Sequence, residues 1–206
     1  MKIFTIGHSN HSIEKFISLL QKYGITAVAD VRSHPYSRYL PHFNQSPLQT
    51  ALSKAGISYV FLGRELGARP EDLSCYDLEG KALYEKIAAT SLFATGIQRL
   101  IEGAEKYHIA LMCAEKDPIT CHRTILVCKN LRQYNVHINH ILPEGILESQ
   151  SELEERLLAK FNKSNNQPIQ LSLFEAPPQA TGSEIDLDIA YQRQGDEIAY
   201  VKVEKK

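Results

Sequence analysis

The chain has 206 residues, of which 43% are hydrophobic, and this size fits one α/β domain with an appendage. Its formal net charge of −1 excludes a global basic field that would attract nucleic acid, so any such binding requires a local patch. No apolar stretch approaches the ~20 residues of a membrane span, and the chain opens on a strand-like run rather than a secretory signal. We therefore expect a cytoplasmic protein without a membrane partner, whose four cysteines are reduced thiols: Cys75, Cys113, Cys121 and Cys128.

Apolar runs of strand length alternate with segments of helical periodicity up to about Ile141. Such runs are typical of parallel strands that are covered on both faces. Strands are predicted at residues 2–6, 25–31, 57–62, 108–113 and 136–141, and helices after Ser12, from Ser46 to Gly56, within 81–106 and over 121–134. The expected fold class is α/β, an open, mainly parallel five-stranded sheet with helices on both faces.

The character of the chain changes near residue 162. Ser151 and Glu154 form a capping box, which predicts a last helix before that point. The following polar, proline-containing segment is expected to be a flexible linker. Alternating apolar residues on either side of Gly195-Asp196 then predict a terminal β-hairpin. The expected organisation is an α/β domain (1–161), a linker (162–183) and a β-hairpin (184–206).

Function in a parallel α/β sheet collects at the carboxyl ends of the strands. The densest group of reactive side chains follows the fourth predicted strand. Cys113 falls at the end of that strand, Glu115 lies in the loop, and Cys121, His122 and Arg123 fall in the first turn of the next helix. Free N–H groups and the helix dipole favour an anion at such a turn and lower the pKa of a thiol there.

Three uses fit these residues. The loop can bind phosphate through Arg123, with Glu115 as acid or base. Cys113 or Cys121 can be a nucleophile with His122 as its base, and His122 is better placed for Cys113 because adjacent helical residues point about 100° apart. Cys113, Cys121 and His122 can bind a metal, although their spacing matches no usual zinc pattern. Alternatively, Cys113 is a core residue and Glu115 forms a local salt bridge with Arg123.

A second group follows the second predicted strand. Asp30 and Arg32 alternate with Val31, so they share a side where the strand leaves the sheet, and Asp30 is a candidate acid or base. Arg32, Arg38 and Ser37 suit phosphate oxygens, and Tyr36, Tyr39 and Phe43 suit stacking on bases. The alternatives are a mutual Asp30–Arg32 ion pair and a solvated loop face.

A third group follows the first predicted strand. Gly7 permits a tight turn, and His8 and Ser9 are placed to enter the same crevice as candidate phosphate-binding residues. His8 is equally well explained as an ordinary hydrogen-bonded histidine.

Five short motifs occur in order along the first 141 residues. They are Thr5-Ile6-Gly7-His8-Ser9, Asp30-Val31-Arg32-Ser33-x-Pro35-x-Ser37-Arg38, Phe43-Asn44, Tyr59-x-x-Leu62-Gly63-x-Glu65-Leu66-Gly67 and Cys113-Ala114-Glu115-x-x-Pro118-x-x-Cys121-His122-Arg123. This series resembles the domain of unknown function 488 family of bacterial and archaeal proteins. The resemblance implies an α/β fold and a loose link to DNA repair, without an established reaction. Ala68 departs from the glycine that many members have there, which puts the tightness of that turn in doubt.

A compact apolar pentapeptide lies in the polar linker. Gln170, Leu171, Leu173 and Phe174 resemble the clamp-binding peptide of bacterial replication and repair proteins, in which Gln anchors and Leu and Phe fill a pocket on the DNA sliding clamp. The alternative is a short edge strand packed on the protein's own sheet.

These observations predict an enzyme that acts on nucleic acid or a nucleotide phosphoester and is recruited to the bacterial sliding clamp. In this hypothesis Arg32, Arg38 and Arg123 hold phosphate, while Cys113 and His122 supply a nucleophile or ligand pair. The alternatives are a non-catalytic nucleotide- or DNA-binding module and a thiol or metal protein that senses redox state. The cofactor, the substrate and the bond that changes stay open at this point.

Overall fold

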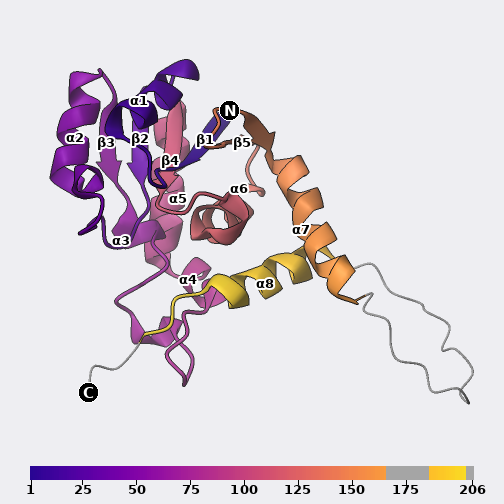
Figure 1. Cartoon of the computed structure of the whole chain (residues 1–206). Coiled ribbons are helices and arrows are strands. Elements are labelled where there is room, and N and C mark those ends of the chain that lie inside the picture. Colours follow the sequence, from indigo (N-terminus) through magenta and orange to yellow (C-terminus); the bar gives the residue numbers. More distant parts are fainter. Residues whose placement is uncertain (166–185, 203–206) are drawn as a thin grey trace, which may run out of the picture.

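The computed structural model describes residues 1–165 and 186–202, and it confirms the α/β fold class (Figure 1). One six-stranded sheet has the order β3-β2-β4-β1-β5-β6, one strand more than expected. The first five strands pair in parallel, and β6 is antiparallel to β5. The strands are β1 (Lys2–Gly7), β2 (Ala27–Asp30), β3 (Ser58–Phe61), β4 (Ile109–Cys113), β5 (His137–Ile141) and β6 (Leu147–Ser149).

Helices cover both faces of the sheet, as expected. On one face α1 (Ile13–Lys22) and α2 (Gln45–Lys54) bury Phe16 and Leu48 against Val28 and Met112. On the other face α5 (Ser91–Ala104) and the segment around residues 123–131 enclose a second hydrophobic cluster, to which Leu111 and Leu126 belong. Alternate residues of the parallel strands therefore enter two separate cores, which explains why their sequences are almost uniformly apolar.

Short helical turns interrupt the loops after β2, β3 and β4. The loop after β2 contains η1 (Pro41–Phe43), whose Phe43 is fully buried between α1 and His8. The remaining turns are α3 (Gly63–Leu66), η2 (Leu73–Cys75), α4 (Tyr84–Ala88) and η3 (Pro118–Thr120). None of the helices in the described parts of the chain is long and apolar enough to cross a membrane.

The helix expected over residues 121–134 has an unusual form. It consists of a π-helical segment, η4 (Arg123–Cys128), followed by the short α6 (Lys129–Leu131). All six residues of η4 are buried, because the segment lies between the sheet and the C-terminal helices. Wide π-helical turns are rare and occur frequently at functional sites.

The prediction of a terminal β-hairpin is wrong. Residues 187–198 form a helix, α8 (Leu187–Ile198), which packs beside α7 (Gln150–Asn165) and runs back toward α4 (Figure 1). Its buried residues Ala190 and Tyr191 lie in a third hydrophobic cluster with Leu157 and Ile125. The apolar residues of this segment fit both the period of a strand and that of a helix, and tertiary packing selects the helix. Ile189, which a half-buried strand would cover, is 46% exposed.

The capping box lies two residues before the predicted one. The Ser149 backbone N–H and hydroxyl donate to the Glu152 carboxylate at 2.7 and 2.8 Å, and the Glu152 N–H donates to the Ser149 hydroxyl at 3.2 Å. Glu154 is used instead in packing, because it accepts from the Tyr191 hydroxyl of α8 at 2.9 Å.

We expect Ser149→Ala to lower the free energy of unfolding by about 1 kcal/mol, because it removes a reciprocal N-terminal cap. Ser151→Ala is the matched control, since Ser151 is exposed inside the same helix, and it should change the free energy by less than about 0.5 kcal/mol. Chemical denaturation of both variants measures the difference. Equal losses would show that Ser149 does not cap α7.

Candidate active site

The carboxyl ends of β1 and β4 meet where the chain changes direction. The connection after β1 passes β4 to reach β2, and the connection after β4 passes β1 to reach β5, with their helices on opposite faces. The backbone pairing continues past the strands, since the His8 and Ser9 N–H groups donate to the Cys113 and Ala114 carbonyls at 2.9 Å. A crevice outside such a switch point is the usual ligand site of an open α/β sheet.

Gly7 permits the close approach of these two loops. A Cβ atom on Gly7 would lie 1.9 Å from the Glu115 carbonyl oxygen. Only glycine therefore allows the loop after β4 to fold directly over the end of β1.

A cavity of about 540 Å³ opens at this edge of the sheet. Its walls come from the loops after β1, β2, β3 and β4, together with residues that follow α8. Seven of the site residues expected from the sequence line it: His8, Ser9, Arg32, Ser37, Cys113, Glu115 and His122.

Asp30 and Arg32 form the mutual ion pair that was the alternative interpretation. Arg32 binds the carboxylate with two nitrogens at 2.9 and 2.6 Å, and the Tyr59 hydroxyl donates to the same carboxylate at 2.9 Å. Asp30 is fully buried and Arg32 is 6% exposed. Because Asp30 already accepts these bonds, it fixes Arg32 rather than facing the cavity as an acid or base.

His8 is held in a defined orientation beside this pair. Its ring stacks on Phe43 with centroids 4.3 Å apart, and its Nδ1 lies 2.9 Å from the Ser9 carbonyl oxygen, so Nδ1 carries the proton. Nε2 then accepts from the Arg32 guanidinium at 3.3 Å. Burial, reinforced by the charge of Arg32, lowers the pKa of His8 to about 4, and the imidazole is neutral at neutral pH.

Cys113 and His122 face each other, although Cys121 is extended and is not the helical neighbour on which that expectation depended. The Cys113 Sγ lies 3.6 Å from Nδ1 of His122, whose Nε2 lies 2.9 Å from the Val31 carbonyl oxygen. Nε2 therefore carries a proton, and Nδ1 points at the thiol. Burial opposes protonation of His122, but hydrogen bonding to Cys121 and the negative charges of Cys121 and Glu115 outweigh it and raise its pKa. Burial raises the pKa of Cys113 well above its ordinary value.

Glu115 and Cys121 form the other half of the same cluster. The Cys121 thiol donates to the Glu115 carboxylate at 3.0 Å. Burial alone would raise the pKa of Cys121, but hydrogen bonding to Cys113 and the charge of Arg123 outweigh it and lower the pKa to about 6. Burial also opposes ionisation of Glu115, yet hydrogen bonds from the two cysteines lower its pKa to about 2.

Arg123 supports the cluster from behind. It is fully buried, and its Nη1 donates to the Glu115 carbonyl oxygen at 2.8 Å while its Nε lies 3.4 Å from the Thr5 hydroxyl. In place of the salt bridge that was the alternative interpretation, Arg123 thus binds the backbone of Glu115. Arg123 does not line the cavity, so this structure offers no direct contact between its guanidinium and a phosphate there.

The four reactive residues lie close enough to share one ion. One ligand atom each from Cys113, Glu115, Cys121 and His122 lies within 4.8 Å of all the others. Thiolate, imidazole and carboxylate groups are the ligands of zinc in proteins.

The remaining predicted site residues lie elsewhere. Arg38 and Tyr39 are exposed and do not line the cavity, whereas Tyr36, which is 74% exposed, does line it. Gln170 to Phe174 lie outside the described residues.

Sequence reasoning missed part of the wall. Arg69 and Tyr200 line the cavity, and the Arg69 guanidinium stacks over the Tyr200 ring at 4.3 Å. Arg69 lies two residues after the motif that ends at Gly67, so its position next to that motif was the available signal. Tyr200 reaches the site only because α8 folds back across the domain, which no local pattern indicates.

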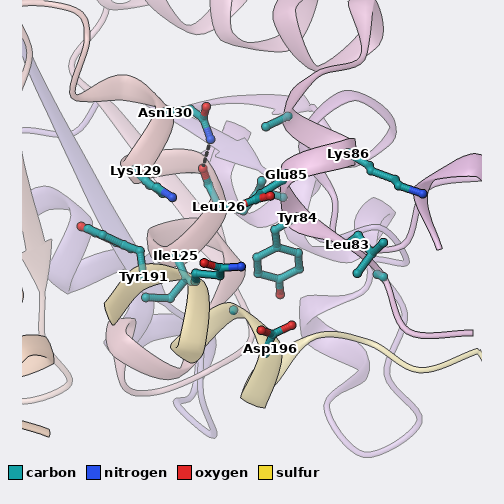
Figure 2. A pocket seen from close by; sticks show the side chains of 14 residues that line it. Leu83, Tyr84, Glu85, Lys86, Ile125, Leu126, Lys129, Asn130, Tyr191 and Asp196 are labelled. Atoms are coloured by element: carbon teal, nitrogen blue, oxygen red, sulfur yellow. Dashed lines mark hydrogen bonds between the residues drawn. The ribbon is translucent and has the colours of Figure 1, made fainter. Parts of the chain in front are cut away.

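A second cavity of about 400 Å³ lies between α4, η4 and α8. Figure 2 shows the Tyr84 ring between η4 and α8, with Asp196 close by. Tyr84 borders both cavities, but none of the cysteine or histidine residues lines the second one. The candidate reactive residues therefore lie at the first cavity and not at the second.

A family model for the domain of unknown function DUF488 matches residues 12–129. No curated protein and no solved structure matches the chain. The matched range contains the loop after β2 and the whole cluster from Cys113 to Arg123.

We expect acid to destabilise the protein through its buried neutral histidines. The unfolded state takes up a proton on His8 below its ordinary pKa of 6.5, whereas the folded state resists protonation until about 4. Stability present above pH 6.5 is therefore lost as the pH falls toward 4, by about 2 kcal/mol between pH 7 and pH 5 for this one group. His140, with its pKa lowered by burial to about 3, adds a similar loss.

Denaturation of His8→Asn at both pH values tests this expectation. Asparagine retains a donor near the Nδ1 position, and the variant should lose less stability on acidification than the wild type. His108→Asn, at an exposed histidine, is the control, and it should lose as much stability on acidification as the wild type. If His8→Asn lost as much stability on acidification as the wild type, the assignment of a neutral His8 would be contradicted.

Proposed function

The chain belongs to the DUF488 domain family, and we propose that it is an enzyme acting on a nucleic-acid or nucleotide phosphoester. The observation that carries the proposal is the cluster of Cys113, Glu115, Cys121 and His122 at the wall of a cavity whose other charged residues are cationic. A set of packed nucleophiles and acid–base groups at a switch point is a candidate reaction centre.

The cavity favours an anionic ligand. Its charged lining residues are Arg32, Arg69 and Lys116, against the single carboxylate of Glu115. Arg32 is neutralised by Asp30 behind it, so Arg69 and Lys116 provide the excess positive charge. Lys116 is only weakly engaged, because its exposed ammonium lies 3.8 Å from Glu144.

Neutral donors surround the same space. Hydroxyl groups of Ser9, Ser33, Ser37 and Thr120 line the cavity. The Ser33 oxygen accepts from the Arg69 backbone N–H at 3.0 Å, which leaves its own hydrogen free to donate to a ligand. Positive charge combined with several hydroxyl donors suits the oxygens of a phosphate group.

The cluster supplies the groups that hydrolysis of a phosphoester needs. A water that attacks phosphorus must lose a proton, the phosphorus–oxygen bond to the leaving group breaks, and the leaving oxygen gains a proton. The ionised Glu115 carboxylate is placed to accept the first proton at the cavity wall. Cys113 and His122 lie beside it as the nucleophile or ligand pair.

Thiol redox chemistry is the second candidate. The sulfur atoms of Cys113 and Cys121 lie within 4.8 Å of each other, which small side-chain movements could close to a disulfide. Mild oxidant would then form a Cys113–Cys121 disulfide reversibly, and phosphate-bearing compounds would not be turned over.

Recruitment to the bacterial sliding clamp is the second part of the proposal. Residues 170–174 fall between α7 and α8, and both helices pack on the domain. Binding of this peptide to the clamp would raise the local concentration of the enzyme there without tight intrinsic binding to DNA. The near-neutral net charge agrees with that arrangement.

Kinetics on a panel of nucleotides and phosphodiesters tests the substrate class. We expect Arg69→Gln to raise the KM of a turned-over phosphoester by about tenfold or more, because a charge-assisted contact is lost. Arg38→Gln is the matched control, since Arg38 is exposed and lies outside the cavity, and its KM should stay unchanged. Failure of the whole panel to bind or react would overturn the proposal.

Binding of the full-length protein to a purified bacterial sliding clamp tests recruitment. We expect micromolar binding that Leu173→Ala/Phe174→Ala abolishes, because these side chains would fill the clamp pocket. Pro177→Ala/Pro178→Ala changes the same segment outside the pentapeptide and should bind like the wild type. Clamp binding that survives the first double substitution would rule out this peptide as the attachment point.

A further inference from the structure

We propose that Cys113, Cys121 and His122 bind one Zn²⁺ ion at the wall of the cavity, with Glu115 beside an open fourth position. The proposal takes the cluster as the reactive centre and in that respect rests on the proposed function. The ion itself is inferred from the arrangement of the ligands and does not depend on the substrate.

The separation of two ligand atoms matches a zinc site. With a Zn–S bond of about 2.3 Å and a Zn–N bond of about 2.0–2.1 Å, tetrahedral geometry places sulfur and nitrogen about 3.6 Å apart. The Cys113 Sγ and the His122 Nδ1 are 3.6 Å apart. The Cys121 sulfur lies within 4.8 Å of both, so a shift of about 1 Å completes the set.

The backbone explains how two neighbouring residues face one point. Cys121 has extended dihedral angles, φ −131° and ψ 136°, whereas His122 is helical. The two side chains are therefore not separated as they would be on a regular helix. This local break, rather than a familiar sequence spacing, creates the site.

The groups around the ligands have the form expected of an outer shell. The Nε2 of His122 donates to the Val31 carbonyl, which fixes the ring and directs Nδ1 at the cluster. The Arg123 backbone N–H lies 3.4 Å from the Cys121 sulfur. Metal-bound histidines are almost always oriented by such a bond, and N–H donors commonly support bound thiolates.

Glu115 is placed as a neighbour of the ion rather than as a ligand. Its Oε2 accepts from the Cys121 thiol at 3.0 Å, so it contacts one of the three ligands in the structure. It also lines the cavity together with Cys113 and His122, so the fourth position is reached from the cavity. A water bound there would lie next to the carboxylate, which is the arrangement of a catalytic rather than a structural zinc site.

The ligand chemistry favours zinc over harder ions. Two thiolates and one imidazole prefer Zn²⁺, whereas Mg²⁺ and Ca²⁺ prefer sets of oxygen ligands. On binding, the two thiols release their protons and the two resulting negative charges balance the charge of the ion.

Metal titration of the reduced, chelator-treated full-length protein tests the inference. We expect one Zn²⁺ per chain, and Co²⁺ in its place should give intense sulfur-to-metal absorption and the visible bands of a tetrahedral site. Bound Zn²⁺ should also protect two thiols from alkylation. These readouts use the wild type, so they do not depend on whether a variant folds.

Variants then assign the ligands. Cys113→Ala and Cys121→Ala should each lose stoichiometric binding, whereas Cys75→Ala, at a buried cysteine outside the cluster, should retain it. Glu115→Gln should also retain the ion, because Glu115 is not a ligand. Wild-type protein that binds no Zn²⁺, or Co²⁺ spectra without sulfur bands, would overturn the proposal, and loss of the ion in Glu115→Gln would overturn the open fourth position.

The outcome can be separated from that of the proposed function. Stoichiometric Zn²⁺ with no turnover of any phosphoester would keep the metal site and reject the phosphoester reaction. Turnover of a phosphoester by protein that binds no metal would keep the reaction and reject the metal site.

Discussion

The candidate site depends on one buried cation. The guanidinium of Arg123 has no exposed surface, and burying a charge is costly unless its donors are satisfied. Here the donors bind the Glu115 carbonyl in the loop after β4 and approach the Thr5 hydroxyl of β1, while the backbone N–H of the same residue faces the Cys121 sulfur. One residue at the start of η4 thus joins two neighbouring strands and the thiol cluster.

The four arginines near the cavity differ in environment, although the sequence treats three of them alike. Arg123 organises the loop from inside the domain, and Arg32 is neutralised by Asp30 and orients His8. Arg38 is exposed outside the cavity, whereas Arg69 stacks on Tyr200 at its wall. An arginine in a polar loop can support the backbone, form an internal ion pair or contact a ligand. Only its burial and its hydrogen-bonding neighbours distinguish these cases.

The parts of the structure that depend on local pattern were predictable. Apolar runs of strand length predict buried parallel strands. The rule that ligands bind at the carboxyl ends of such strands then selected the loops that carry His8, Arg32 and Cys113. Those inferences use only neighbours in sequence and the known geometry of strands and helices.

The parts that depend on tertiary packing were not predictable. Residues 187–198 carry a pattern that fits a strand or a helix, and contacts with α7 and η4 make it a helix. Ser149 rather than Ser151 caps α7, because the strand β6 extends up to residue 149 and fixes where the helix can begin. Tyr200 reaches the cavity only through this packing.

The C-terminal helices also explain the form of η4. Its residues enter two cores, since Leu126 belongs to the cluster against the sheet and Ile125 to the cluster with Tyr191 of α8. Being covered on both sides, the segment has no solvent-exposed face to carry polar residues, and the Thr124 hydroxyl has no hydrogen-bond partner among the described residues. The same segment begins with Arg123, whose backbone N–H faces the Cys121 sulfur of the thiol cluster.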